Sequence, residues 1–366
     1  MKSFETSICR WKDNAQAALT LSFDGCYQMT YELAMKVLMR YKMPATWFIA
    51  TGSAGSILEG RPVATWQDLE RGAELGMEIA SHTVTHPLLA FSPSEATARL
   101  SRSILKRGWA VLRPNNITRV TRVISNYARA RQGVNHTIIL DEAIQSKNMI
   151  ESQIPSQKVL SFAYPGGRYN SALQKGVREA GYLSARATED GYNYPNSMGW
   201  YALKSKVWNT DVNVKVANGW IDFALEKGTW LIETLHVVSK DGTTGYYYDT
   251  AISDFEAHLA YISSQNYWVD TQQNIAKYIK ERDATRVRLS VLFQDRVKLV
   301  AENDLNSKIQ NQALTLRTLI PPVWSRVMIR QAEDVQEVLP VKEEGKDYIY
   351  YRVLPNKGEI ILTQIR

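Results

Sequence analysis

The chain alternates short, strongly apolar runs with longer amphipathic stretches, and this rhythm recurs from residue 18 to about residue 281. The first pair is the run ALTLSFD at 18–24, followed by YELAMKVLMRY at 31–41, whose apolar residues recur at helical spacing. Strand-like runs that alternate with helices are typical of parallel α/β units. We therefore expect an α/β fold built on a parallel sheet, either a barrel or a doubly wound sheet.

Two segments depart from this rhythm. Residues from about 107 to 150 fit it poorly and are predicted to be a basic, mostly helical insertion; no Asp or Glu occurs from Ala96 to Leu140. After residue 285, short alternating runs are separated by Asn, Asp, Gly and Pro, which predicts a small β-rich domain over 286–366. The expected organisation is an α/β domain over 1–285, containing the insertion, followed by this β domain.

Composition narrows the classes of function. The formal net charge is +7, but no helix-turn-helix, zinc-finger or RNA-binding signature accompanies the basic residues, so no nucleic-acid partner is predicted. No apolar run approaches the roughly 18 residues needed to span a membrane. Cys9 and Cys26 are too few for a disulfide scaffold, and whether they pair stays open. The first residues lack the apolar segment of a signal peptide, which leaves a cytoplasmic protein or one whose export signal is absent from this chain.

Polar residues gather where the predicted strands end. Asp24 follows the first strand, His82 and His86 follow the third, Arg168 follows FAYPGG, and His236 ends LIETLH. In both candidate folds the functional site lies at the carboxyl ends of the strands. If the segment from His82 to His86 makes a helical turn, the two imidazoles face the same way and can share one metal ion.

Four of these segments, in this order, resemble the motifs of the polysaccharide deacetylase family, the NodB-homology group also called carbohydrate esterase family 4. The resemblance runs from about Ala18 to Glu281, interrupted by the basic segment. The segment LTLSFDGCY is similar to the first motif, SHTVTHP to the second, FAYPGGRYN to the third and LIETLH to the last. The second motif is the most diagnostic of the four.

The resemblance implies a deformed (β/α) barrel and the hydrolysis of acetyl groups on an N- or O-acetylated polysaccharide or oligosaccharide. It also implies a divalent metal ion, most commonly Zn²⁺, that polarises the acetyl carbonyl and activates water. Because glycans of this kind are usually extracellular or part of a cell wall, we expect an exported protein. The resemblance further assigns roles to six residues: metal ligands His82 and His86, general base Asp24, general acid His236, an oxyanion-binding backbone N–H near Gly166, and Leu235 in the acetyl pocket.

The chain departs from the family pattern at two positions. The family usually has a second Asp directly after the base, as the third metal ligand, and this chain has Gly25 there. Four outcomes stay open: Asp24 moves onto the metal, another carboxylate supplies the third ligand, Cys26 ligates as thiolate, or the metal site is degraded. Many members also carry an Arg where this chain has Ala163, and Arg168 could reach the same space.

These departures keep two alternatives to a metal-dependent deacetylase open. One is a catalytically impaired glycan-binding protein on the same fold. The other is a metal-independent amide hydrolase of the same superfamily. The sequence does not predict the oligomeric state, the particular glycan, or the role of the C-terminal β domain.

Overall fold

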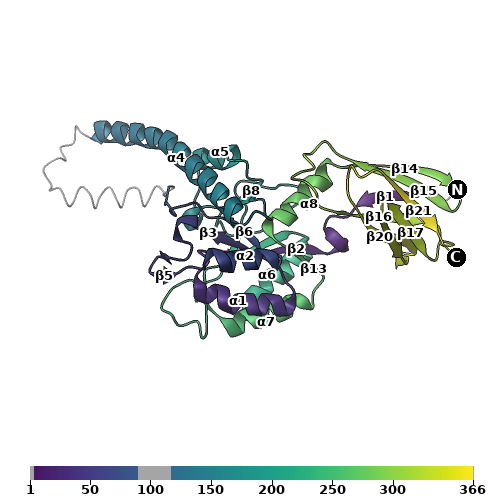
Figure 1. The fold of residues 1–366 in the computed structure, drawn as a ribbon, viewed down its shortest axis with the longest axis horizontal. Helices are drawn as coiled ribbons and strands as arrows, with labels where there is room; N and C mark the ends of the chain where they lie inside the picture. Colours follow the sequence, from purple (N-terminus) through teal and green to yellow (C-terminus); the bar gives the residue numbers. More distant parts are fainter. Residues whose placement is uncertain (1–3, 90–116, 366) are drawn as a thin grey trace.

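A curled, half-barrel-like parallel sheet forms the centre of the molecule (Figure 1). The computed structural model describes residues 4–89 and 117–365, with side chains left out of the description for 117–134. The strand order is β8-β7-β6-β3-β2-β10-β9, and β13 also pairs with β2. The strands are β2 (Ala17–Asp24), β3 (Ala45–Ile49), β6 (Glu78–Ser81), β7 (Ser161–Ala163), β8 (Ser184–Arg186), β9 (Lys206–Val207), β10 (Trp230–Leu235) and β13 (Tyr267–Val269). The α/β fold of the deacetylase type expected from the sequence is thus confirmed.

Strand β2 lies in the middle of this sheet, and every one of its residues is buried. It pairs in parallel with β3 on one side and β10 on the other, with Leu21 opposite Ala45 and Glu233. Both faces are covered by other parts of the chain, which explains why ALTLSFD is nearly continuous in apolar residues instead of alternating with polar ones. The sequence thereby places Asp24 at the end of a completely buried strand.

The connecting helices begin and end where the sequence offers capping residues. Thr65 and Asp68 form a capping box at the start of α2, and Gly228 adopts a left-handed conformation at the end of α6. Residues 107–116 of the predicted insertion lie outside the described residues, and α4 extends from residue 117 to 153. The helices are α1 (Gln28–Tyr41), α2 (Trp66–Glu74), α4 (Ile117–Gln153), α5 (Ser171–Glu179), α6 (Val214–Lys227), α7 (Ile252–Ser263) and α8 (Gln272–Ala284).

Beyond α8 the chain forms two antiparallel sheets, as the alternating runs after residue 285 predict. One has the order β14-β15-β21-β17-β18 and the other the order β1-β16-β20-β19. The strands are β1 (Glu5–Ile8), β14 (Arg286–Phe293), β15 (Arg296–Glu302), β16 (Leu314–Ile320), β17 (Val327–Gln331), β18 (Asp334–Val338), β19 (Val341–Glu343), β20 (Lys346–Val353) and β21 (Glu359–Gln364).

The N-terminal strand β1 belongs to these C-terminal sheets, because it pairs antiparallel with β16. A single apolar core also runs from the parallel sheet into them, and it includes Trp11, Trp230, Val297 and Leu316. The boundary at residue 285 therefore marks a change of architecture with a shared core across it, and the division into two domains stays a prediction.

Two further findings bear on the sequence expectations. Cys9 and Cys26 are both buried and free, so they are not paired in this structure. In the described part of the chain, none of the helices combines the length and apolarity that crossing a membrane requires.

Candidate active site

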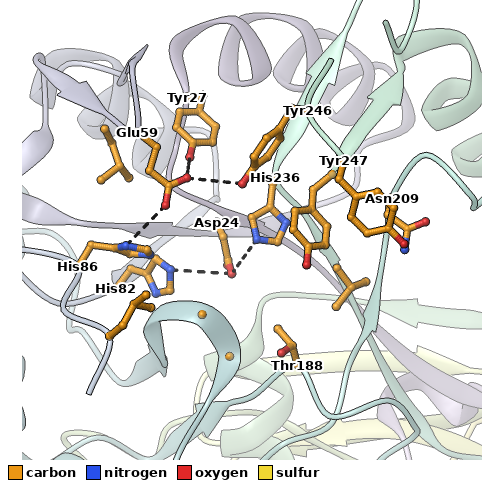
Figure 2. Close-up of a pocket in the computed structure, with 17 residues that line it drawn as sticks. Asp24, Tyr27, Glu59, His82, His86, Thr188, Asn209, His236, Tyr246 and Tyr247 are labelled. Atoms are coloured by element: carbon orange, nitrogen blue, oxygen red, sulfur yellow. Dashed lines mark hydrogen bonds and ion pairs between the residues drawn. The ribbon is translucent and has the colours of Figure 1, made fainter. Parts of the chain in front are cut away.

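A cavity of about 500 Å³ opens at the carboxyl ends of the parallel strands (Figure 2). Four of the residues that the motifs single out line it together: Asp24, His82, His86 and His236. The carboxyl ends of the strands therefore bring these four side chains together at one cavity. The other lining residues are Gly25, Tyr27, Leu58, Glu59, Leu88, Gly166, Gly167, Thr188, Val207, Asn209, Tyr246, Tyr247 and Tyr248.

The segment from His82 to His86 brings its two imidazoles together without a helical turn. Thr83 and His86 have φ angles of 71° and 56°, so the chain turns through left-handed conformations there. The His86 backbone N–H donates to the Thr83 hydroxyl at 3.0 Å, which closes the turn. The two imidazole ring centroids are 4.8 Å apart. The helical turn considered from the spacing of His82 and His86 is therefore not formed, although the two rings are neighbours.

His82 is oriented by the backbone of the neighbouring strand. Its Nδ1–H donates to the Ala163 carbonyl oxygen at 2.8 Å, and its Nε2 lies 3.9 Å from Asp24 Oδ2. Burial lowers the pKa of His82 to about 3, because the opposing attraction of Asp24 does not outweigh the loss of hydration. His82 is therefore neutral at physiological pH and presents Nε2 toward the cavity floor.

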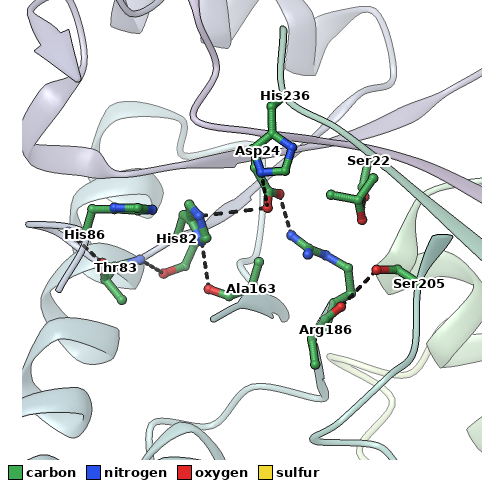
Figure 3. Close-up of polar contacts among 12 residues, drawn as sticks. Ser22, Asp24, His82, Thr83, His86, Ala163, Arg186, Ser205 and His236 are labelled. Carbon is green, nitrogen blue, oxygen red and sulfur yellow. Dashed lines mark hydrogen bonds and ion pairs between the residues drawn. The ribbon is translucent and has the colours of Figure 1, made fainter. Parts of the chain in front are cut away.

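Asp24 is held by a buried guanidinium that the sequence analysis did not single out (Figure 3). Arg186, the last residue of β8, donates from Nη2 to Asp24 Oδ1 and is fully buried. Burial alone would raise the pKa of Asp24, but the charge of Arg186, helped by His82 and His236, lowers it to about 2. Asp24 is thus ionised at neutral pH.

Within the described parts of the chain, the Arg186 guanidinium has no hydrogen-bond partner other than Asp24. Its Nε and Nη1 atoms have no hydrogen-bond partner among the described residues, and its guanidinium carbon lies 5.1 Å from the centre of the Phe48 ring. A buried arginine with a single carboxylate partner is costly, so the contact with Asp24 is the interaction that defines its position. Ala163, where many family members carry an Arg, is a neighbour of Arg186 in the β7–β8 pairing.

His236 faces Asp24 from the opposite side. Its Nε2 lies 3.8 Å from Asp24 Oδ2, and its ring stacks on Tyr248 with centroids 4.7 Å apart. Burial lowers the pKa of His236, against the attraction of Asp24, and its Nδ1 has no partner among the described residues. One oxygen of Asp24 is therefore flanked by Nε2 atoms of two histidines.

A second carboxylate, Glu59, lies at the rim of the cavity on the turn between β4 (Ile57–Leu58) and β5 (Arg61–Pro62). Tyr27 and Tyr246 donate their hydroxyls to Glu59 Oε2 at 3.0 and 3.5 Å. Its other oxygen lies 4.0 Å from His86 Nδ1. No motif or periodicity in the sequence marks Glu59.

Gly25 occupies a backbone conformation that disfavours any side chain. Its φ is +84°, and a Cβ built there would lie 3.0 Å from the Tyr27 ring. Its N–H donates to the Phe48 carbonyl oxygen at 3.0 Å, which fixes the turn after β2. The local structure therefore favours glycine at position 25 over a residue that carries a carboxylate.

The remaining sequence candidates lie less centrally. Gly166 lines the cavity within η4 (Pro165–Gly167), while the N–H of Gly167 is engaged by the Tyr164 carbonyl oxygen at 2.8 Å. Arg168 is exposed and Leu235 is fully buried, and neither is among the described residues that line the cavity.

Cys26 is buried behind the turn, and it too is absent from the described lining of the cavity. Burial, together with the nearby charge of Asp24, raises the pKa of its thiol well above the usual value. A thiolate is the form that binds metals, so this environment disfavours Cys26 as a ligand.

Helix α4 holds the turn that carries the two histidines. Glu142 accepts hydrogen bonds from the backbone N–H groups of Val84 and Thr85 at 2.7 and 2.9 Å, and from the Thr85 hydroxyl at 2.7 Å. The segment from about 107 to 150 was expected to be an insertion, and Glu142, which lies within it, braces the second motif.

We expect Glu142→Ala to lower the free energy of unfolding by about 1–3 kcal/mol, because two backbone donors lose a charged acceptor. Urea unfolding of the purified variant measures this. Asp141→Ala is the control, since Asp141 is an exposed neighbour on the same helix. Equal stability of the two variants would show that Glu142 does not brace the turn.

Comparison with known proteins identifies several that are similar to this chain. Among the proteins it matches is a gellan lyase of Bacillus sp., with 19% identity over 380 residues that cover 98% of this chain and 13% of the lyase. The chain therefore spans 13% of the length of that relative. Similar solved structures include a Streptococcus pyogenes deacetylase in complex with acetate, with 20% identity, TM-score 0.35 and coverage of 50% of this chain and 62% of that one. A peptidoglycan deacetylase of Bacillus subtilis has 16% identity, TM-score 0.38 and coverage of 73% and 93%.

A family model matches part of the chain. Residues 12–185 match the family model described as polysaccharide deacetylase. This range includes the strands that carry Asp24 and the two histidines of the second motif, together with their bracing helix α4. Over residues 12–185, which are slightly less than half of the chain, the sequence is similar to the polysaccharide deacetylase family.

Proposed function

We propose that the protein is a hydrolase that removes acetyl groups from an N- or O-acetylated glycan. The observation that carries the proposal is the position of Asp24 Oδ2, which lies 3.9 Å from His82 Nε2 and 3.8 Å from His236 Nε2 at the floor of an open cavity. An ionised carboxylate between two imidazoles is a natural arrangement for moving protons between water and a leaving group. The family match supports acetyl groups on a glycan as the target.

In this proposal Asp24 is the general base and His236 the general acid. Water adds to the acetyl carbonyl carbon while Asp24 takes its proton. The bond from the carbonyl carbon to the sugar nitrogen or oxygen then breaks, and His236 delivers a proton to the leaving atom, so acetate and the free amine or alcohol result. Arg186 holds Asp24 in its ionised form, which is the form that accepts the proton.

The family relationship implies a divalent metal ion, most commonly Zn²⁺, and the donor chemistry of the site can be tested against it. His82 fits as a ligand, because Ala163 holds its Nδ1–H and leaves Nε2 bare toward the cavity. His86 lies beside it, so two imidazoles would hold the ion, which when bound would polarise the acetyl carbonyl. Among the described residues, however, no three His, Cys, Asp or Glu side chains already converge on one point.

The walls of the cavity support a sugar as the ligand. Tyr246, Tyr247 and Tyr248 line one wall, and Tyr27 adds a fourth ring. Their faces offer apolar area while their hydroxyls offer polar contacts, as the two kinds of surface on a pyranose require. We further propose that the protein is exported, since acetylated polysaccharides of this kind are outside the cell.

The test is acetate release from acetylated oligosaccharides and peptidoglycan fragments. We expect turnover by the natural protein and a loss of about 10²–10⁴-fold in kcat for His236→Ala, the usual contribution of a general acid. His136→Ala is the matched control. His136 pairs with Glu179, and neither residue is among the described residues that line the cavity. Equal turnover by the natural protein and His236→Ala would remove His236 from the mechanism.

One observation favours a second candidate function. The side chain that usually completes the metal site is missing at Gly25, while the cavity and its tyrosine wall are present. A glycan-binding protein without turnover would use that wall alone. Saturable binding of acetylated oligosaccharides by calorimetry, with no acetate released in the presence of added Zn²⁺, would favour this candidate over the hydrolase.

A further inference from the structure

We propose that Tyr248 is a positioning residue that holds the imidazole of His236 in place by stacking on its face. The stack takes the place of the hydrogen bond at Nδ1 that usually orients a histidine which transfers protons. The proposal deepens the proposed function, since it rests on His236 as the general acid. It also gives Tyr248 a role that is separate from the sugar contacts of the tyrosine wall.

The imidazole of His236 has no hydrogen bond that holds its ring among the described residues. Its Nδ1 atom is buried without a partner, and its Nε2 atom lies 3.8 Å from Asp24 Oδ2, which is beyond hydrogen-bond distance. The backbone of His236 is fixed, because Thr30 on α1 donates its hydroxyl to the His236 carbonyl oxygen at 3.3 Å. The orientation of the ring therefore has to be set by packing.

The ring of Tyr248 supplies this packing. The centroids of the Tyr248 and His236 rings are 4.7 Å apart, and their planes are inclined by 27°, which is a stacked arrangement. A stack suits a general acid, because it is compatible with both states of the imidazole. The face of a tyrosine attracts the protonated ring as a cation and packs against the neutral ring through dispersion.

The strand pairing next to the site places Tyr248 beside His236. Strands β11 (Val237–Ser239) and β12 (Asp249–Ala251) are parallel, and their first residues lie opposite each other. His236 and Tyr248 each come one residue before these strands. The Val237 N–H donates to the Tyr248 carbonyl oxygen at 3.1 Å, so the pairing continues to this point. The register of β11 and β12 thus brings the two side chains to neighbouring positions.

The loop that carries Tyr248 is held at several points. The buried carboxylate of Asp249 accepts hydrogen bonds from the Thr244 backbone N–H at 2.8 Å and from the Thr244 hydroxyl at 2.6 Å. The Tyr247 hydroxyl donates to Asp211 Oδ2 at 2.8 Å. The Tyr247 ring also packs edge-on against the Tyr248 ring, with centroids 5.1 Å apart. A ring that is held in this way can restrict the imidazole that stacks on it.

The first test observes the stack directly, in metal-free protein without substrate. Because the face of an aromatic ring shields protons that lie over it, we expect the ring protons of His236 to be shifted upfield in NMR spectra. Their signals are identified by their absence in His236→Ala. In Tyr248→Leu these signals should move to the positions of a histidine without a stacked ring, and in Tyr248→Phe they should stay upfield.

The control for the spectra is Tyr194→Leu, which changes an exposed tyrosine outside the described lining of the cavity. It should leave the His236 signals unchanged. If Tyr248→Leu does not fold, as judged by circular dichroism and the thermal midpoint, Tyr248→Met replaces it in both tests. Unchanged His236 signals in the variant without an aromatic ring would overturn the proposal.

The second test separates the positioning of His236 from contact with the sugar, by measuring kcat and KM for acetate release. We expect Tyr248→Leu to lower kcat about 3–30-fold, the range that a stacking contact can contribute, with a smaller change in KM. Tyr248→Phe should restore kcat, because the ring is the part that contacts His236. A raised KM at unchanged kcat in Tyr248→Leu would show that Tyr248 only binds sugar, and would refute the proposal.

The two tests keep this inference distinguishable from the proposed function. If the natural protein releases no acetate, the proposed function fails. The NMR signals of His236 would still decide whether Tyr248 orients the imidazole, because they require neither substrate nor turnover.

Discussion

Arg186→Met is expected to lower the free energy of unfolding by about 3–5 kcal/mol, because it leaves the buried carboxylate of Asp24 without its partner. Both side chains are almost completely shielded from solvent. Urea unfolding monitored by tryptophan fluorescence measures the change. Arg40→Met is the control, since the Arg40–Glu256 pair has side chains that are 61% and 36% exposed and should contribute less than about 1 kcal/mol.

A double variant separates the lost attraction from the cost of an unpaired charge. In Arg186→Met with Asp24→Asn, no buried charge remains, so we expect a large part of the stability lost in Arg186→Met to return. If Arg186→Met alone is as stable as Arg40→Met, the buried ion pair does not hold the cavity floor together.

Asp24→Asn is expected to reduce acetate release about 10²–10⁴-fold, because an amide cannot take the proton of the attacking water. Asn keeps the shape of Asp and can still accept a hydrogen bond from Arg186, so the variant should fold. Its effect should fall on kcat, with KM changed far less, since the sugar contacts of the tyrosine wall remain.

The control for this prediction is Asp283→Asn, which changes an exposed carboxylate at the end of α8. Circular dichroism and the thermal midpoint establish that Asp24→Asn is folded before its turnover is interpreted. Turnover within a factor of two of the natural protein would exclude Asp24 as the general base, and attention would move to the two histidines beside it.

The positions of Asp24, His82, His86 and His236 could be predicted because each follows a strand that is strongly apolar or part of a recognisable motif. Parallel strands deliver their carboxyl ends to one edge, so the sequence needs only to reveal where strands end. The same reasoning recovers the curled parallel sheet and the antiparallel strands after residue 285.

Arg186 also lies at the carboxyl end of a strand, but the sequence analysis missed it. Strand β8 has three residues, which is too short for an alternation of apolar and polar residues to be recognised. Its pairing with β7, beside Ala163, depends on a crossover through α5 that the sequence does not specify residue by residue. Arg168 was the more visible candidate since it stands inside a motif, yet it is exposed. Glu59 lies in a two-residue turn, where side-chain direction is set by distant partners such as Tyr246.

The pairing of β1 with β16 has a consequence for how the protein is made. Residues 5–8 meet residues 316–319, so β1 must wait until β16 has been synthesised before it can pair. At about 5–20 residues per second, that wait is on the order of 15–60 s, during which the edge of β1 has no native partner. The parallel sheet can assemble in that interval, before β1 and β16 are able to pair.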